Sequence, residues 1–271
     1  MTFESYSTRF FDWNGDYATD RRVTGKRISR RQCTEKTALL NNRIIPALGK
    51  LKLIDIDRST IKQLRNDLFR EGVSGATINK CLSCIRAILE SAEDKRLIQA
   101  IPRIERAAEQ KKSRGILKPD EAKALFLKPW PDIRAYTANI LAAATGLRQG
   151  EILALQRQNV KTGYLEILRG WNQRTGELNE TTKSGRARYV PIPEKVEVAI
   201  HELIEISPWT SPESYLFFTL TRQTKPIEGR ALTRGLYAAM RGIGIHDQER
   251  EARWIDFHSW RHWFNSIMIN Q

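Results

Sequence analysis

Residues 142–160 read AAATGLRQGEILALQRQNV, where one helix ends and a second begins within a few residues. The pair Thr145-Gly146 predicts the break, and Arg148 lies in the first turn of the next helix, on one face with Glu151. An arginine is locally unfavourable there, because the helix dipole favours anions at an N-terminus. Beside free backbone N–H groups it makes a good seat for a phosphate. The simpler alternative is a surface arginine in an intrahelical salt bridge.

A lysine lies in a second stretch, residues 181–193, TTKSGRARYVPIP. Lys183 precedes a Ser-Gly turn between two predicted strands, so we expect its amine at the tip of a hairpin. A lysine at a hairpin tip is most often simply solvated. It can also reach into the minor groove of DNA or donate a proton to a leaving oxygen.

A third cluster lies in residues 258–271, HSWRHWFNSIMINQ, which predict an amphipathic helix. His258, Arg261 and His262 fall at positions i, i+3 and i+4, an arrangement that more often caps and packs a helix than forms a site. A site is indicated by the combination of two arginines, a lysine and a histidine on separate elements, without a carboxylate cage for a metal. This set suits metal-free phosphoryl transfer, because guanidinium groups neutralise charge at phosphorus while lysine and histidine transfer protons.

The chain is strongly basic, with 45 Lys and Arg against 31 Asp and Glu, a net charge of +14 and a pI near 9.9. This surplus favours a polyanionic partner, although charge alone does not separate DNA from RNA, an anionic membrane or no partner at all. A hydrophobic content of 41% is typical of a globular protein, and no apolar run approaches the roughly 20 residues that span a bilayer. Since the N-terminus lacks a signal-peptide pattern, we expect a cytoplasmic protein without a membrane partner.

Cysteines occur three times, an odd number for a disulfide framework. Cys81 and Cys84 form a CxxC pair inside a helical pattern, INKCLSCIRAIL, and no second Cys or His pair follows at zinc-binding spacing. We therefore predict buried helix cysteines rather than a metal site.

The front half of the chain has the pattern of a helical domain. Helices are predicted in FESYSTRFFDW, in residues 32–48, in STIKQLRNDLFREG with Ser59 as its cap and Gly72 at its end, and in residues 74–97. The last of these has core spacing at Ile78, Leu82, Ile85 and Leu89. Residues 20–31, DRRVTGKRISRR, predict a basic, turn-rich segment.

The back half is predicted to mix helices and strands. It follows a polar, basic stretch, AAEQKKSRGILKPDEAKAL, which indicates a boundary near residue 113, and a helix start at Pro119. Residues 1–113 carry a net charge of +9 and residues 114–271 a net charge of +5. Short strands are predicted in GYLEILRG, ELNETTK and ARYVPIP. Helices are predicted at residues 119–128, 131–144, 194–206, 230–242 and 257–269.

Three stretches, TGLRQGEILAL, TKSGRARYVPIP and HSWRHWF, resemble in order and separation the signature boxes of tyrosine recombinases, the phage-type integrases. Upstream, IIPALGKLKLIDIDRSTIKQL and GVSGATINKCLSCIRAILESAEDKRLI are similar to their helical core-binding domain. The resemblance implies an all-α, SAM-like core-binding domain at residues 1–108, a linker at 109–117, and a mainly α catalytic domain with a small antiparallel sheet at 118–271. That last domain would be incomplete at its C-terminus.

Carried over by position, the resemblance assigns Arg148 and Arg261 to holding the scissile phosphate. Lys183 would be the acid for the leaving 5′ oxygen, and His258 would assist proton transfer. It implies a C-shaped clamp around double-stranded DNA and strand exchange through a 3′-phosphotyrosyl link, with no metal or other cofactor. Trp260 and Trp263 stand where leucine and threonine are common in the family, and we expect them to alter the packing around His258.

The nucleophile of the family is a tyrosine a few tens of residues beyond the HxxR box. All seven tyrosines of this sequence precede that box. We therefore expect this chain to bind DNA without cleaving it, either as a trimmed form of a longer integrase or as a naturally inactive DNA-binding regulator. A type IB topoisomerase shares the chemistry, but the core-binding resemblance argues against that class.

The resemblance also implies a prokaryotic, nucleoid-associated protein that forms a homotetramer on paired DNA sites, with a DNA-bending accessory protein as a possible partner. We expect this chain to be a monomer in solution. DNA contacts are expected from two helices of the front half, and most of them should position phosphates rather than read bases. The candidate residues are Arg31, Lys36, Thr77, Asn79, Lys80 and Arg86.

Overall fold

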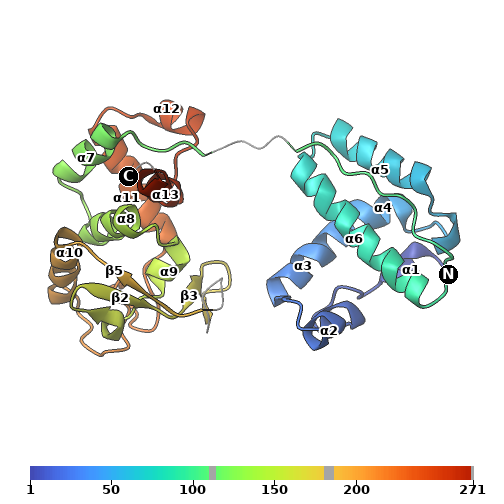
Figure 1. Cartoon of the computed structure of the whole chain (residues 1–271), viewed down its shortest axis with the longest axis horizontal. Coiled ribbons are helices and arrows are strands. Elements are labelled where there is room, and N and C mark those ends of the chain that lie inside the picture. Colours follow the sequence, from blue (N-terminus) through green and yellow to red (C-terminus); the bar gives the residue numbers. More distant parts are fainter. Residues whose placement is uncertain (110–113, 180–185, 270–271) are drawn as a thin grey trace. The chain divides into compact units, whose positions relative to one another are not determined.

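The computed structural model describes residues 1–109, 114–179 and 186–269 of the chain. It divides into two compact units, Met1–Lys112 and Ser113–Gln271, and each has its own hydrophobic core (Figure 1). Within the described residues, no helix combines the length and the apolar content that crossing a membrane requires.

Unit 1 is built from helices in its described residues. They are α1 (Phe3–Ser7), α2 (Asp16–Val23), α3 (Arg30–Leu39), the π-helical turn η1 (Leu40–Ile44), α4 (Ile45–Leu48), the 3₁₀ turn η2 (Leu53–Asp55), α5 (Arg58–Arg70) and α6 (Gly75–Asp94). The expected helix over residues 32–48 is therefore α3, η1 and α4 in uninterrupted succession.

The core of unit 1 is organised around α6, the long helix in Figure 1 that packs against α3 and α5. Its four predicted core residues are each at most 3% exposed, as expected for apolar side chains that recur every three or four residues: Ile78, Leu82, Ile85 and Leu89. Cys81 and Cys84 are buried free thiols on the same helix, and burial raises the pKa of Cys81 to about 11.

Three expectations for unit 1 were wrong. The cap of α5 is Asp57, not Ser59, because the Asp57 carboxylate accepts a hydrogen bond of 2.8 Å from the backbone N–H of Thr60. The helix expected in FESYSTRFFDW ends at Ser7, after which the chain turns. A helix that was not expected, α2, takes up the start of the basic segment through Val23.

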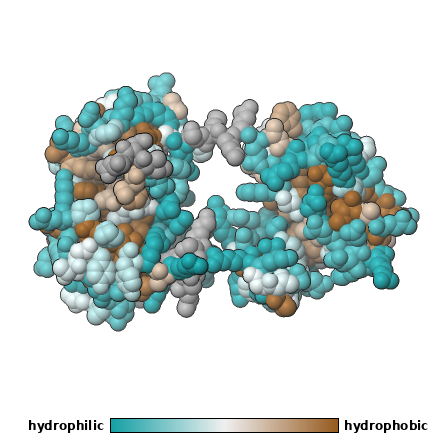
Figure 2. Space-filling model, in the orientation of Figure 1, coloured by the Kyte–Doolittle hydropathy of each residue, from teal (hydrophilic) through white to brown (hydrophobic). Residues whose placement is uncertain are grey.

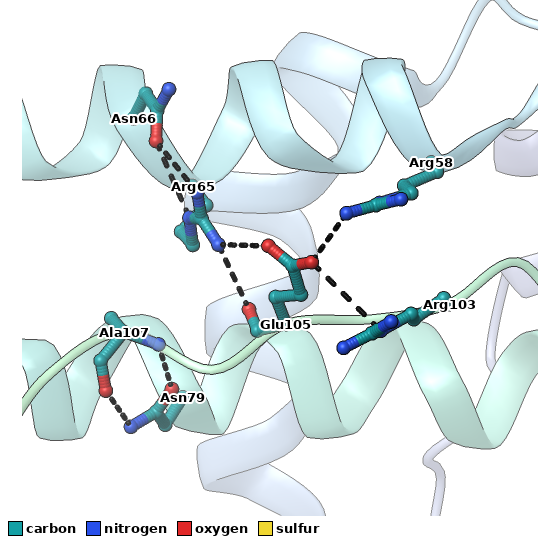
Figure 3. Close-up of polar contacts among 7 residues, drawn as sticks. All are labelled: Arg58, Arg65, Asn66, Asn79, Arg103, Glu105 and Ala107. Carbon is teal, nitrogen blue, oxygen red and sulfur yellow. Dashed lines mark hydrogen bonds and ion pairs between the residues drawn. The ribbon is translucent and has the colours of Figure 1, made fainter.

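Residues 101–109 form an extended strap that belongs to unit 1 and runs along α5 and α6 (Figure 3). The side-chain amide of Asn79 donates to the Ala107 carbonyl at 3.0 Å and accepts from the Ala107 N–H at 2.8 Å. Gly75 is required beside it, because a Cβ there would lie 2.0 Å from the carbonyl oxygen of Ala108. These contacts attach the strap, residues 101–109, to the helices of unit 1.

Unit 2 surrounds the central helix α8 with helices and two small antiparallel sheets. Its helices are α7 (Pro119–Leu127), α8 (Ile133–Thr145), α9 (Gln149–Leu153), the 3₁₀ turn η3 (Arg157–Asn159), α10 (Glu194–Glu205), α11 (Gly229–Gly242), α12 (Asp247–Ala252) and α13 (Ser259–Ile269). Its strands are β1 (Val160–Lys161), β2 (Tyr164–Ile167), β3 (Gly170–Asn172), β4 (Glu177–Asn179) and β5 (Arg188–Pro191).

The strands form one sheet in the order β1-β2-β5 and a second sheet of β3 and β4. The strand predicted in GYLEILRG is β2, whereas β3, which shares only Gly170 with that stretch and belongs to the other sheet, was not predicted. The five predicted helices are present within two residues of their expected ends. Helix α12, whose residues are all at least partly exposed, was not predicted because it lacks an apolar face.

Candidate active site

Arg148 lies at the start of α9 as its N-cap residue, one position before the helix rather than in its first turn. The chain reaches this position through Gly146, whose φ of 62° ends α8 in a left-handed conformation. The backbone N–H of Arg148 donates to Glu151 Oε2 and its Nη1 donates to Glu151 Oε1, both at 3.0 Å. The salt bridge considered from the sequence thus exists, and its acidic partner is buried.

Glu151 is only 3% exposed, and its carboxylate is shared with a second arginine. Arg188, the first residue of β5, donates to Oε1 at 3.3 Å and to Oε2 at 2.8 Å. Burial alone would raise the pKa of Glu151, but the hydrogen bonds from Arg188 and from the Arg148 amide outweigh it and hold that pKa below its usual value. The carboxylate is therefore charged, and it joins α9 to the sheet.

Arg261, on α13, lies in the same neighbourhood. Its Nη1 donates to the carbonyl oxygen of Gly146 at 2.8 Å, and Phe264 packs so closely that a Cβ on Gly146 would lie 2.7 Å from its ring. Partial burial and then the positive charge of Arg148 lower the pKa of Arg261. The two arginines of the first and third sequence clusters are thus brought together beside the turn at the end of α8.

Trp260 anchors the helix that carries Arg261. It is 2% exposed, and its indole N–H donates to Oδ1 of the buried Asn139 on α8 at 2.8 Å. The Asn139 amide in turn donates to the carbonyls of Ala135 and Leu232. The tryptophan therefore fills the core between α8 and α13 and satisfies its own N–H, as buried tryptophans usually do.

His258 lies just before α13 with its ring exposed and 5.3 Å, centroid to centroid, from that of His262. Its backbone N–H donates to Asp256 at 2.8 Å, and Asp256 also pairs with Arg114. Partial desolvation and then the positive charge of Arg114 lower the pKa of His258 below its usual value, and the interactions with His262, Arg261 and Arg148 act in the same direction. The imidazole is consequently neutral near pH 7 and able to accept a proton.

Lys183 lies outside the described residues, between β4 and β5 in the sequence, so its expected position at a hairpin tip stays a prediction. Within the described part of the chain, no three His, Cys, Asp or Glu side chains come together in a group that could hold a metal ion. The described site thus contains guanidinium groups, the imidazoles of His258 and His262, and one buried carboxylate that binds Arg148 and Arg188.

Two residues of this site, Arg188 and Arg114, were not singled out from the sequence. Arg188 had a detectable signal in the sequence, because alternation along the strand RYVP places it on one face with Val190, and both are half-buried in the structure. A charge on the inner face of a strand requires a buried partner of opposite sign. Arg114 offered no such signal, since its contact with Asp256 joins residues 142 positions apart.

The candidate DNA-contact residues of unit 1 have different surroundings. Lys80 and Arg86 on α6 are exposed, as is Arg31 on α3, which pairs with Glu35 at 2.8 Å. Lys36 is half-buried, with Nζ 5.1 Å from the ring centroid of Phe11. Hydrophilic residues make up most of the face of this unit that Figure 2 shows.

Thr77 and Asn79 are already engaged within unit 1. The Thr77 hydroxyl lies 3.0 Å from that of the cap residue Ser74. Asn79 is 5% exposed and holds Ala107 of the strap (Figure 3), which explains its place on α6 without a DNA contact.

A cationic feature of unit 1 that was not singled out surrounds Trp13. The guanidinium carbons of Arg22 and Arg30 lie 4.3 and 5.3 Å from the indole centroid, within the range of cation–π attraction. These arginines belong to the basic segment at residues 20–31, and both are exposed. The indole thus orients two positive charges at the surface beside α3.

Comparison with known proteins identifies the family to which this chain belongs. The phage integrase family model matches residues 116–271, and the model of the N-terminal SAM-like domain of phage integrases matches residues 26–69. The chain belongs to the phage integrase family. The predicted fold class, a helical SAM-like domain followed by a mainly helical domain with small antiparallel sheets, is confirmed.

Solved structures of integrases share this fold. The integrase of transposon Tn1549 in complex with a circular intermediate DNA aligns with a TM-score of 0.75 at 18% identity, covering 94% of this chain and 85% of that one. A lambda integrase dimer bound to a COC′ core site gives 0.70 at 17% identity, with 100% and 88% covered. A lambda integrase tetramer bound to a Holliday junction gives 0.71 at 17% identity, with 100% and 71% covered. No curated protein matches this chain in sequence.

Proposed function

We propose that this protein is a site-specific DNA recombinase and that unit 2 activates one scissile phosphodiester of bound duplex DNA. The observation that carries the proposal is the convergence of Arg148, at the start of α9, with His258 and Arg261, at the start of α13, in a chain that belongs to the phage integrase family. The positive charges of Arg148 and Arg261 disfavour each other and the charged form of His258, so a bound anion would stabilise this arrangement. Negative charge grows on the oxygens of the scissile phosphate in the transition state, and preorganised cationic donors stabilise that charge.

The chemistry assigned to each residue follows from its side chain. Arg148 and Arg261 donate hydrogen bonds to the non-bridging oxygens and neutralise the charge that grows on a pentacoordinate phosphorus. A neutral His258 accepts the proton of the attacking hydroxyl. We propose that Lys183 protonates the 5′ oxygen as the phosphorus–oxygen bond breaks. None of these steps involves a metal.

The family reaction also uses a tyrosine as the attacking group. Residues 1–271 contain seven tyrosines, all before His258 in the sequence, and Tyr215 among them is only 7% exposed. We propose that the polypeptide of residues 1–271 binds and polarises the phosphodiester but does not form a phosphotyrosyl link by itself. The half of the site that it supplies is the half that stabilises the transition state.

For unit 1 we propose a DNA-binding surface along α2, α3 and α6. Its cations, all exposed except the half-buried Lys36, suit phosphate contacts, and such contacts position a protein without reading sequence. The residues proposed are Arg22, Arg30, Arg31, Lys36, Lys80 and Arg86. We further propose residues 1–108 as the core-binding domain, 109–117 as a linker and 118–271 as the catalytic domain, with a monomer in solution and a tetramer of the recombinase on paired sites.

The proposal is tested with a small nucleophile that replaces the tyrosine. Duplexes bound by residues 1–271 are selected from a random pool, and an end-labelled selected duplex is incubated with protein and hydroperoxide. The hydroperoxide anion attacks phosphorus and the 5′ oxygen leaves as a hydroxyl. We expect cleavage at one position of the selected site, and loss of that cleavage in Arg148→Ala with binding retained.

The matched control is Arg222→Ala, which removes an exposed arginine of unit 2. Enrichment of a site without any hydroperoxide-dependent cleavage would contradict phosphodiester activation and favour a DNA-binding regulator. Cleavage spread over unselected sequences would favour a topoisomerase-like activity. Hydroperoxide-dependent cleavage limited to one position of the selected site supports the recombinase.

A further inference from the structure

The carboxylate of Glu151 accepts four hydrogen bonds, which fills its acceptor capacity of roughly four lone pairs. Two donors belong to Arg148, through its backbone N–H and Nη1, and two belong to Arg188, through Nη1 and Nη2. Arg188 thus holds both carboxylate oxygens in the bidentate geometry that lysine cannot reproduce. A carboxylate that is 3% exposed has no access to water in place of these partners.

We propose that Arg188 is a positioning residue for phosphodiester activation and that it acts through Glu151 on Arg148. Arg188 does not need to touch the phosphate for this role. By holding Glu151 in one orientation, it fixes the carboxylate oxygen that receives Arg148 Nη1. The remaining N–H donors of the Arg148 guanidinium are then aimed in one direction, and a guanidinium has five such donors in a rigid plane.

A charge balance supports the same role. Arg148 and Glu151 alone form a neutral pair, which attracts a phosphate weakly. With Arg188 included, the group carries a net charge of +1, and the carboxylate no longer cancels the charge of Arg148. Breaking such a buried network leaves an uncompensated charge, so the three residues are expected to act as one unit.

Arg188 also joins two parts of the site that lie apart in sequence. It is the first residue of β5 and pairs with Ile167 of β2, while its guanidinium group reaches the start of α9. Lys183 lies five residues earlier in the sequence. The Arg188–Glu151 contact therefore fixes the strand that follows Lys183 to the helix start that carries Arg148.

This inference rests on the proposed function, and its test uses the hydroperoxide reaction with residues 1–271 and the selected duplex. The variants are Arg188→Gln, Arg188→Lys, Glu151→Gln and the double variant. We expect Arg188→Gln to slow cleavage by about 10²-fold, the size that misplacement of a catalytic group by about 1 Å produces. The dissociation constant for the duplex should rise by a smaller factor than the cleavage rate falls, and the control Arg241→Gln, which removes an exposed ion pair with Asp247, measures the effect of losing one positive charge elsewhere in unit 2.

Arg188→Lys keeps the positive charge, so it tests the role of Arg188 even if Arg188→Gln fails to fold. We expect Arg188→Lys to show only part of the cleavage rate of the unchanged protein. If Arg188 acts through Glu151, replacing Arg188 in the Glu151→Gln background should slow cleavage no further. Full additivity of the two changes, or a rate in Arg188→Gln equal to that of Arg241→Gln, would overturn the inference. If Arg148→Ala also cleaves normally, it is the proposed function that fails.

A second measurement is independent of cleavage. Removing Arg188 takes away the strongest hydrogen bonds that lower the pKa of Glu151, so that pKa should rise. A carboxyl with a lowered pKa stabilises the fold above its unfolded pKa and loses that contribution as pH falls. Acid unfolding should therefore begin at a higher pH in Arg188→Gln, and carboxyl NMR of Glu151 should report the raised pKa. An unchanged Glu151 titration would contradict the coupling.

Discussion

Two glutamates of this chain are each surrounded by arginines, one in each unit. Glu105 of the strap pairs with Arg58 at 2.6 Å and with Arg65 at 3.4 Å, and its side chain is 35% exposed (Figure 3). Glu151 pairs with Arg148 and Arg188, and its side chain is 3% exposed. In both cases the arginines lower the pKa of the glutamate.

This difference in exposure corresponds to a difference in role, because Glu105 helps to attach a segment of the chain whereas Glu151 orients a side chain of the site. Water and salt screen the Glu105 cluster, and the strap also has the Asn79–Ala107 hydrogen bonds and apolar contacts to hold it. The Glu151 carboxylate depends on its own hydrogen bonds, because they must replace the water that burial removed. The surface cluster therefore adds to a segment that is already attached, whereas the buried cluster determines where a functional arginine points.

The largest expected effect is the loss of the buried carboxylate charge. Glu151→Gln should lower the free energy of unfolding by about 3 kcal/mol, the lower end of the range for a buried ion pair, because Arg148 and Arg188 lose their common counter-ion while about a third of each side chain stays in contact with water. Chemical denaturation of residues 1–271 measures this change. The matched variant is Glu105→Gln, for which we expect a smaller loss; an equal or larger loss there would break the comparison.

The strap should depend more on Asn79 than on Glu105. Asn79→Ala leaves the N–H and the carbonyl of Ala107 without their partner in a partly buried setting, and we expect a loss of about 1–2 kcal/mol. Limited proteolysis within residues 101–109 should become faster in the same variant. Asn66→Ala, which removes only an acceptor for Arg65, is the control. Equal proteolysis rates in the two variants would mean that Asn79 does not hold the strap.

Local patterns in the sequence predicted some features of this protein, and contacts between distant residues could not be predicted. The order of the three boxes predicted the family and the fold class, and the apolar spacing of α6 predicted its buried face. These are local patterns. The Arg188–Glu151 and Arg114–Asp256 contacts join residues 37 and 142 positions apart, and no local pattern records such a partner. Asn79 was expected at the DNA surface because the sequence does not show the strap that covers it.

The exposed cations of unit 1 should contribute through charge alone. If Arg22 and Arg30 each contact a phosphate, replacing both with glutamine should reduce the slope of log K against log salt by about 0.9 per contact. The preferred DNA sequence should stay the same, because phosphate contacts carry no sequence information. Binding titrations at several salt concentrations measure the slope. Arg70→Gln, on the same unit and paired with Asp67, is the control, and an unchanged slope in the double variant would remove Trp13 and its arginines from the DNA surface.

The smallest effect concerns His258. Its lowered pKa means that the unfolded chain takes up a proton first as pH falls, so this residue reduces stability below its ordinary pKa of about 6.5. A phosphate beside it would reverse the balance of charge and raise that pKa. NMR titration should therefore show a His258 pKa below 6.5 in the free protein and a higher value with DNA. A pKa that DNA leaves unchanged would separate His258 from the phosphate.

The most direct measurement is a structure of residues 1–271 bound to the selected duplex. The guanidinium groups of Arg148 and Arg261 should each donate to non-bridging oxygens of the same phosphate at about 3 Å, with Glu151 still bridging Arg148 and Arg188. Contacts of the two arginines with different phosphates, or a duplex bound away from the turn at Gly146, would contradict the account.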